Sequence, residues 1–505
     1  MWKNLFAAKP LSLIVEEMKT GKRLNRVLGP WQLAGVGIGG IIGTGIFVLT
    51  GVAAHDKAGP ALILSFVVAG IACIFAALCY AEFAAMVPVA GSAYTYAYAT
   101  LGELFAWIIG WDLVLEYTVA SAAVAHGWSH YFQDFIGMFG ISIPHILTNA
   151  PFDFNPILGK FFLTGTVCDF PAIVITFLIM GILVVGVQES ASFNTVMVFI
   201  KLSVVLFVIV VGAFYIHPKN WVPFAPYGYT GIGFFGKTLL GRTDSAGNPL
   251  GVFAGAAIIF FAYIGFDAVS TQAEEAIEPQ KSVPFGIITS LIVCTILYIA
   301  VTAVLTGMIP YKQINVDAPI AEAFKQVGLP WAQGLISIGA LAGITSVLLV
   351  MMLSQPRVFL AMARDGLLPR KFFGAIHDKF KTPYKSTILT GIVVATMSSL
   401  IPLRVLAELG NIGTLLAFLI VCAAVLIMRK THPHTERPFA CPMVPWIPAG
   451  GIVTCLLLMF SLPVENWWSL FIWLSIGLVI YFFYSRHNSV LAEERRRIAA
   501  RPDPA

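Results

Sequence analysis

Two ionisable residues lie deep inside long apolar stretches of this sequence. Glu116 lies in the stretch 96–133, and Lys201 lies in the stretch 193–216. If these stretches cross a membrane, a charged side chain in each costs about 2.5–3.5 kcal/mol on insertion scales, so both are candidate functional groups. Such a carboxylate is suited to bind a cationic ligand group or to share a proton. Such an amine is suited to gain and lose a proton.

Structural roles are the alternatives for both residues. The Glu116 carboxylate is equally explained by hydrogen bonds to tyrosine, serine or backbone groups, and the Lys201 stem by snorkelling toward an interface. Asp112 lies one helical turn before Glu116, and we interpret it as structural. Asp267 is a candidate cap of a short helix. His126 is interpreted as a hydrogen-bonded core residue rather than a ligand.

A glycine-rich stretch could place a ligand between such groups. Six of the thirteen residues from Gly35 to Phe47 are glycine, within an apolar run at 28–54. Each glycine costs a helix roughly 1 kcal/mol relative to alanine. This predicts a helix that opens at mid-membrane and offers backbone N–H and C=O groups to a small ligand. Close helix packing through small residues is the alternative, and the glycines alone do not separate the two.

A second interruption occurs five apolar stretches later. The residues Phe260 to Asp267 include Gly265 and lie near the middle of the stretch 249–273. Since five is an odd number, two units that start with these stretches have opposite orientations in a membrane. Interrupted segments at matching positions of two halves are typical of transporters built from inverted repeats.

The composition is that of an integral membrane protein. Of 505 residues, 58% are hydrophobic and 11% charged, and the mean hydropathy is +0.85. Soluble domains are nearer 25% charged. We predict an all-α fold with twelve spans of about 20 residues or more, near 28–54, 60–87, 96–133, 170–188, 193–216, 249–273, 284–309, 329–362, 384–402, 404–428, 447–463 and 467–485.

The distribution of lysine and arginine predicts the orientation. With the N-terminus inside, 22 of these residues fall in inside segments and eight in outside segments. Both termini are therefore expected in the cytoplasm. The net charge of +5 follows from these loops and indicates no nucleic-acid partner. The seven cysteines have no metal-ligand spacing, and we predict neither a metal nor a cofactor.

The predicted organisation has six parts. They are a cytoplasmic N-terminal segment (1–27), a first five-helix repeat (28–216), an extracellular loop (217–248), a second, inverted five-helix repeat (249–430), helices eleven and twelve (431–485) and a cytoplasmic tail (486–505). The outside segments 134–169 and 217–248 are expected to be ordered caps. Glu82 and Glu103 flank the polar segment Pro88–Thr95 and are assigned to gating or structure.

Several motifs resemble the amino acid–polyamine–organocation superfamily, and within it a bacterial form of the cationic amino acid transporter family. The similarity spans residues 25–485, and its motifs are Gly39–Phe47, Ala58–Pro60, Tyr80–Phe83, Pro88–Tyr94, Gly102–Tyr117, Phe261–Asp267 and Gln355–Pro369. The resemblance implies the leucine-transporter fold with two additional helices. It also implies alternating access and proton-coupled uptake of amino acids through a bacterial inner membrane.

The resemblance also implies roles for individual residues. The substrate carboxylate would meet Gly43, Thr44 and Gly45, and its ammonium group would meet the carbonyls of Ile41, Phe261, Ala262 and Ile264. These positions agree with the polarity of helix ends. Glu116 would be the cavity carboxylate, and Lys201 would replace a sodium site.

One position departs from the family pattern. Members that prefer arginine or lysine have a small residue near Ile344, where this chain has a branched one. A narrower pocket makes small neutral amino acids such as alanine at least as good candidates as cationic ones. An exchanger and a polyamine carrier are the competing transporter functions. No channel filter and no HExxH or GxSxG constellation is present, which argues against a channel and a membrane enzyme. The expected partners are the amino acid, protons and lipid, and a small membrane subunit is compatible with the sequence.

Overall fold

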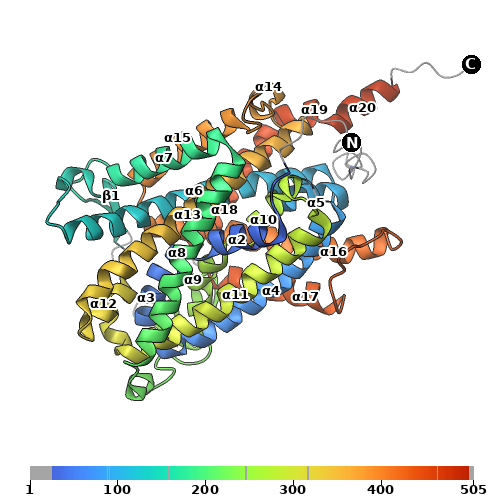
Figure 1. Cartoon of the computed structure of the whole chain (residues 1–505). Helices are drawn as coiled ribbons and strands as arrows, with labels where there is room; N and C mark the ends of the chain where they lie inside the picture. Colours follow the sequence, from blue (N-terminus) through green and yellow to red (C-terminus); the bar gives the residue numbers. More distant parts are fainter. Residues whose placement is uncertain are drawn as a thin grey trace, which may run out of the picture.

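The computed structural model describes Lys9 and residues 26–87, 89, 91–155, 160–244, 247–315, 318–462 and 464–499. Most of the predicted N-terminal segment 1–27, Pro88 and the last residues of the predicted tail (500–505) lie outside the described residues. Long helices run side by side through the described part of the molecule (Figure 1). An all-α membrane fold is thus confirmed.

The helices of the first half follow the predicted apolar stretches. They are α2 (Pro30–Ile41), η2 (Gly45–Leu49), α3 (Thr50–Ala53), η3 (Ala54–Ala58), η4 (Gly59–Ala61), α4 (Leu62–Met86), α5 (Ala93–Thr100), α6 (Glu103–Gly137), η5 (His145–Leu147), α7 (Phe170–Val185), α8 (Val187–Ala213) and η6 (Pro218–Trp221).

The second half begins with another interrupted segment. Its helices are α9 (Val252–Ile259), η7 (Phe260–Tyr263), α10 (Ala268–Thr271), η8 (Ala273–Glu275), α11 (Pro279–Met308), η9 (Tyr311–Gln313), α12 (Pro319–Gln326), α13 (Pro330–Arg364), α14 (Arg370–Phe373), α15 (Tyr384–Leu400), α16 (Leu403–Thr431), α17 (Trp446–Ser461), α18 (Val464–Ile480), η10 (Tyr481–Ser485), α19 (Arg486–Asn488) and α20 (Val490–Ala499).

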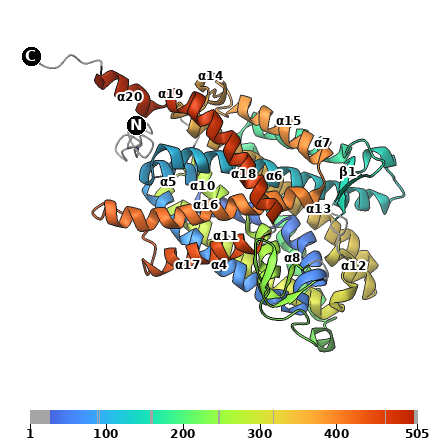
Figure 2. The same cartoon turned by 180° about the vertical axis from the view of Figure 1, so that it is seen from behind.

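The described strands lie in the two predicted outside segments or directly after the second. They form three antiparallel pairs, β1 (Phe152–Asn155) with β2 (Lys160–Leu163), β3 (Ile232–Phe234) with β4 (Lys237–Leu240), and β5 (Arg242–Thr243) with β6 (Pro249–Leu250). In both views β1 and α12 lie at one end of the molecule and α5, α19 and α20 toward the other (Figures 1 and 2). Segments predicted on opposite sides of a membrane therefore lie at opposite ends.

The third predicted span starts too early. The apolar pattern runs through residue 96, but α5 and α6 are separate helices. Gly102 has φ +100°, a conformation that favours glycine, and the chain turns there. Glu103 then occupies the first turn of α6, where a carboxylate stabilises the helix dipole.

The described helices differ in length and apolar character. Eight described segments are long and apolar enough to cross a membrane, and one of them, Pro30–Met86, holds the first two predicted spans. The apolar helices Phe170–Val185 and Trp446–Ser461 are shorter. Helix α15 coincides with the predicted ninth span but has only 17 residues. The count of twelve crossings stays a prediction.

The helix packing has the exchange symmetry that a repeat of five helices predicts. Helix α4 packs on α11, α6 on α13, and α7 on α15, and each pair joins elements at equivalent places in the two halves. The packing of α2 on α11 has its counterpart in α9 on α4, and the packing of α6 on α16 has its counterpart in α13 on α8. This pattern supports two repeats of five helices. Their bounds, 28–216 and 249–430, stay a prediction.

Candidate functional site

Both predicted interruptions are present. Helix α2 ends at Ile41, Ile42 is extended (φ −77°, ψ 103°), and helical geometry resumes at Gly45 as one π-helical turn. In the second segment, η7 ends at Tyr263, Ile264 is extended (φ −57°, ψ 132°) and Gly265 has φ +120°. Each break leaves backbone groups without helical partners at the centre of the protein.

The two breaks lie against each other. A Cβ atom built on Gly45 would lie 2.3 Å from the Cα atom of Ala262, and one built on Gly265 would lie 2.6 Å from the carbonyl oxygen of Gly40. A side chain at either glycine would therefore collide with the backbone of the opposite segment. The glycines serve here to let two unwound segments approach each other.

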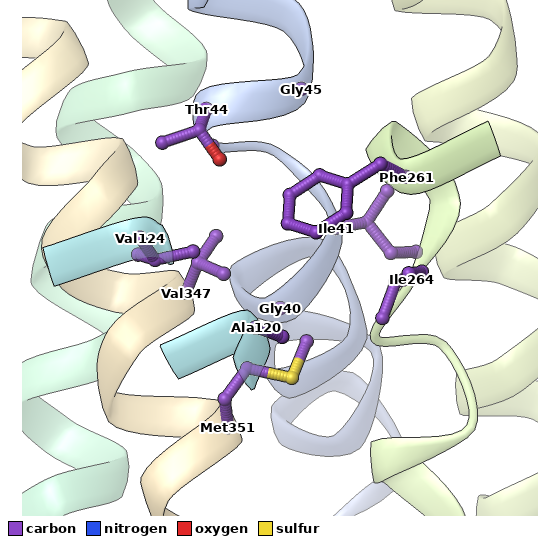
Figure 3. Close-up of a pocket in the computed structure, with 11 residues that line it drawn as sticks. Gly40, Ile41, Thr44, Gly45, Ala120, Val124, Phe261, Ile264, Val347 and Met351 are labelled. Carbon is purple, nitrogen blue, oxygen red and sulfur yellow. The ribbon is translucent and has the colours of Figure 1, made fainter. Parts of the chain in front are cut away.

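A small cavity lies at the breaks (Figure 3). Helix α6 contributes Ala120 and Val124, and helix α13 contributes Val347 and Met351. The remaining lining residues come from the two interrupted segments, and they are Gly40, Ile41, Gly43, Thr44, Gly45, Phe261 and Ile264. Apart from the Thr44 hydroxyl, the lining side chains are apolar.

The cavity unites six of the predicted substrate-binding residues. Ile41, Gly43, Thr44, Gly45, Phe261 and Ile264 line it. Ala262, Glu116 and Ile344 are buried but are not among the lining residues of the described part of the chain. Helix α13 instead faces the cavity with Val347 and Met351. No sequence pattern distinguishes Val347 from Ile344, which lies three residues earlier.

Tyr298 of α11 joins the two breaks, and the sequence analysis did not identify it. Its hydroxyl oxygen lies 2.7 Å from the carbonyl oxygen of Ile41 and 2.9 Å from that of Ala262. Both carbonyls were predicted to face a substrate ammonium group. Since a carbonyl oxygen has two lone pairs, each retains capacity for a second donor. The Tyr298 hydroxyl has one hydrogen, which is donated to one of the two carbonyls or shared between them, and so it ties both carbonyls to α11.

Lys201 of α8 binds the C-terminal end of α2, the helix before the first break. Its buried ammonium group donates to the carbonyl oxygens of Ile38, Gly39 and Ile42, each at 2.9 Å, and lies 2.7 Å from the Ser346 hydroxyl. These carbonyls form the negative end of α2, where a cation is stabilised. Lys201 thus does not line the cavity but holds the backbone that does.

Two buried carboxylates, Asp112 and Glu116, lie on α6 before its cavity-lining residues. Glu116 precedes Ala120 by one turn, so it lies on the face of α6 that lines the cavity. Within the described residues, no hydrogen bond reaches the carboxylate oxygens of Asp112, and Glu116 interacts with the Thr414 hydroxyl of α16, beyond ordinary hydrogen-bond geometry. Asp112 packs beside Gly413 of α16. Buried carboxylates normally have donors, so these two are available to a ligand or a proton.

The prediction that Asp267 caps the second half-helix is wrong. Asp267 precedes α10 but already has helical dihedral angles (φ −65°, ψ −30°), and its side chain makes no cap. A capping residue needs extended geometry to reach the following N–H groups. Its Oδ2 atom instead accepts a hydrogen bond of 2.5 Å from the Tyr117 hydroxyl, and its Oδ1 atom accepts one from the Gly265 N–H.

Buried glutamates form ion pairs and accept hydrogen bonds that connect helices distant in the sequence. Arg357 of α13 binds both carboxylate oxygens of Glu275, which follows the second break. Glu82 accepts hydrogen bonds from Arg429, Arg437 and the Cys441 N–H. Glu103 accepts from the hydroxyls of Tyr98 and Tyr481. Glu82 and Glu103 were predicted to serve gating or structure, and these contacts are compatible with either role.

Comparison with known proteins agrees with this architecture. The model of the family described as amino acid permease matches residues 28–483. The branched-chain amino acid permease BcaP of Bacillus subtilis (strain 168) is 48% identical over 97% of this chain and 99% of its own length. The methylthioribose transporter of the same organism is 47% identical over the same shares, 97% and 99%.

A plant relative is more distant. Cationic amino acid transporter 1 of Arabidopsis thaliana is 32% identical over 94% of this chain and 85% of its own length. The family comprises membrane transporters and not enzymes, and it implies the leucine-transporter fold for this chain. With a match that covers most of its length and two interrupted helices around a central cavity, the chain belongs to the amino acid permease family.

Proposed function

We propose that this permease is a secondary active transporter that carries amino acids with neutral, apolar side chains together with protons, by alternating access. The observation that carries the proposal is the central cavity between the two breaks, where backbone polar groups meet apolar side chains. Backbone groups suit the two charged ends that all amino acids share. The apolar side chains set the preference among them.

The backbone of the first break suits a carboxylate. The N–H groups of Ile46 and Phe47 both donate to the Gly43 carbonyl, so the new helix makes its first hydrogen bonds there. The N–H groups of Gly43, Thr44 and Gly45 come before those bonds, at the positive end of the helix. We assign the substrate carboxylate to these groups and to the Thr44 hydroxyl.

The opposite ends of both breaks suit an ammonium group. The carbonyls of Ile41 and Ala262 are held by Tyr298, and the Phe261 carbonyl accepts the Ile264 N–H at 3.2 Å. Each keeps a lone pair for a cation. We assign the substrate ammonium group to the carbonyls of Ile41, Phe261, Ala262 and Ile264, as the resemblance to the transporter superfamily implied.

The side-chain part of the cavity favours neutral substrates. Ala120, Val124, Val347 and Met351 carry no charge that would pair with an arginine or lysine side chain. A relative with 48% identity is a branched-chain amino acid permease, whereas the cationic amino acid transporters are 32–39% identical. The second possibility is that the chain belongs with the cationic amino acid transporters and that Glu116 binds a cationic substrate side chain.

Lys201 is our candidate for proton coupling. Its ammonium hydrogens hold three carbonyls at the first break. Loss of the proton would remove one hydrogen and the charge, and would loosen the geometry of the cavity wall. Protonation would then set substrate affinity, which is the linkage that a symporter requires. An exchanger would need no such linkage.

Uptake into proteoliposomes tests the proposal. Purified protein would be assayed with labelled leucine, alanine, arginine, a polyamine and methylthioribose, with and without an inward proton gradient. Leucine or alanine accumulation that a protonophore abolishes supports the proposal. Accumulation of arginine or the polyamine alone, or exchange that ignores the gradient, would reject it. Methylthioribose is included because one relative with 47% identity is named for it.

We further propose that the protein resides in a bacterial inner membrane with both termini in the cytoplasm, as the lysine and arginine distribution predicted. The opposite placement of α12 and α20 in the molecule supports this topology (Figure 1). Cysteine labelling with a membrane-impermeant reagent tests it. A cysteine introduced in α12 should react in intact cells, and one in α20 should react only after the cells are opened.

A further inference from the structure

Three side chains with metal-ligating atoms come together at the ends of two helices, away from the residues that line the cavity. His126 and His130 lie on α6, and Asp169 precedes α7. One ligand atom from each lies within 4.8 Å of the others, and the two imidazole rings have centroids 4.9 Å apart. His126 and Asp169 are buried, while His130 is exposed and gives the group access to solvent.

Helix geometry places the two histidines on one face. They are four residues apart, and positions i and i+4 are neighbours on a helix surface. Asp169 meets them because it caps α7, where its Oδ1 atom accepts the Ala172 N–H at 3.2 Å. The arrangement is thus set by backbone elements and not by mobile loops.

The two carboxylate oxygens of Asp169 have different partners. Its Oδ1 atom also accepts a hydrogen bond of 2.5 Å from the Ser129 hydroxyl, which in turn accepts one from the Gln133 amide. No hydrogen bond from the described residues reaches Oδ2, although the Nδ1 atom of His126 lies 3.0 Å from it. A buried carboxylate oxygen that faces an imidazole nitrogen can bind a cation together with that nitrogen when the imidazole loses its hydrogen.

His126 has a second partner that fits a ligand role. Its Nδ1 atom lies 3.2 Å from the carbonyl oxygen of Ser398. Nδ1 is also the ring nitrogen that faces Asp169 Oδ2 at 3.0 Å, close to the spacing of two ligands of one zinc ion. A metal that binds both atoms would therefore take the place of the hydrogen on Nδ1. The expected core histidine therefore also has the orientation of a ligand.

We propose that His126, His130 and Asp169 form a binding site for a divalent first-row transition metal ion, with Zn²⁺ as the natural choice. Imidazole and carboxylate are the ligands of zinc sites with an open fourth position. Tetrahedral ligands of one zinc ion lie roughly 3.3 Å apart, given Zn–N bonds of about 2.0–2.1 Å. Binding by all three side chains requires the exposed His130 side chain to move closer to the other two, and the ion then joins α6 to the start of α7.

The site is separate from the proposed transport chemistry. Val124 is the last residue of α6 that lines the cavity, and His126 and His130 lie beyond it toward the end of the helix. Metal binding is accordingly measurable without a transport assay, and failure of one proposal leaves the other intact.

The test uses the full chain in detergent, with an affinity tag that contains no histidine, after removal of metal by a chelator. Zn²⁺ binding is followed by calorimetry, and Co²⁺ serves as an optical probe that Zn²⁺ should displace. We expect one Zn²⁺ per chain and a higher unfolding temperature in its presence. Substitution of even an outer-shell partner weakens metal sites 10–100-fold, so His130→Ala should weaken binding at least about tenfold.

His217→Ala is the matched control, since His217 is exposed and precedes η6, outside the cluster. It should bind Zn²⁺ as the wild type does. Equal Zn²⁺ affinity of wild type and His130→Ala, or no binding by the wild type, overturns the proposal. If His130→Ala does not fold, His130→Asn serves in its place, with the unfolding temperature in chelator as the check on folding.

Discussion

The ammonium nitrogen of Lys201 lies 2.9 Å from the carbonyl oxygen of Ile42, the residue at which the first segment leaves helical geometry. Two further carbonyls and the Ser346 hydroxyl complete its surroundings. One charged group on α8 therefore stabilises the break that the cavity needs. This contact gives Lys201 a structural role in addition to the coupling role that we propose, and experiments must separate the two.

Lys201→Met should abolish proton-driven accumulation while some exchange of substrate persists. Methionine fills similar volume but carries no proton to exchange. It also leaves three carbonyls without their donor, at about 1–3 kcal/mol for each buried group left unsatisfied, so the unfolding temperature should fall. Uptake with and without a proton gradient measures the first effect, and thermal unfolding measures the second.

Lys325→Met is the control, because Lys325 is exposed on α12 and pairs with Glu322. It should retain wild-type coupling. If Lys201→Met still accumulates substrate in response to the gradient, the coupling role is wrong, even where stability is reduced.

Gly45→Ala should lose substrate binding by at least about tenfold. The new Cβ atom would lie 2.3 Å from the Cα atom of Ala262, and backbone cannot move aside without separating the two breaks. Gly35→Ala is the matched control in the same apolar stretch, because its Cβ atom would meet no atom within 4 Å. It should be neutral or stabilising by up to about 1 kcal/mol. Equal substrate affinity of the two variants would contradict the proposed site.

The glycine pattern and the repeat of five spans were sufficient to predict both breaks and most of the cavity backbone. These features are visible in a sequence because unwound backbone in a membrane requires particular residue types at matching positions. Glycine also explains why the third span was predicted to start too early. The chain turns at Gly102, between α5 and α6, inside a continuous apolar run.

Contacts between side chains of distant elements could not be predicted in the same way. Tyr298 and Val347 are ordinary apolar-face residues of their helices, and only the rotation of α11 and α13 brings them to the breaks. Asp267 failed as a cap because its backbone geometry depends on the turn at Gly265. Rotation and local dihedral angles follow from packing, and packing is not encoded in a local pattern.

Val347→Ala should shift preference toward larger side chains, such as phenylalanine relative to alanine, by several-fold. The substitution removes two methyl groups from the cavity wall. Competition of unlabelled amino acids against labelled leucine uptake measures the shift. Ile344→Ala is the control on the same helix, since Ile344 is fully buried but does not line the cavity. It should lower stability by about 2–5 kcal/mol and leave the preference unchanged. A changed preference in Ile344→Ala together with an unchanged preference in Val347→Ala would show that Ile344 sets the specificity.

Tyr298→Phe should weaken substrate binding with little loss of stability. The variant keeps the ring but removes the hydroxyl that lies 2.7 Å and 2.9 Å from the carbonyls of Ile41 and Ala262. A hydrogen bond of this kind contributes about 1 kcal/mol to folding. Its loss would let the carbonyls move from the positions in which they bind the substrate ammonium group. Tyr227→Phe removes a similar hydroxyl-to-carbonyl bond outside the site and should leave affinity unchanged. Scintillation proximity binding of labelled substrate distinguishes these outcomes.

Arg357→Met should destabilise the protein strongly, by about 3–5 kcal/mol, because it leaves the Glu275 carboxylate buried and unpaired. Glu275 follows the second break, so the loss should also disturb the position of α10 relative to α13. Adding Glu275→Gln removes the orphaned charge and should restore part of the stability. Arg370→Met, which breaks the exposed pair with Glu493, should cost less than about 1 kcal/mol. Thermal unfolding of the four proteins in detergent provides the comparison. A double variant less stable than Arg357→Met alone would show that the charge is not the cause.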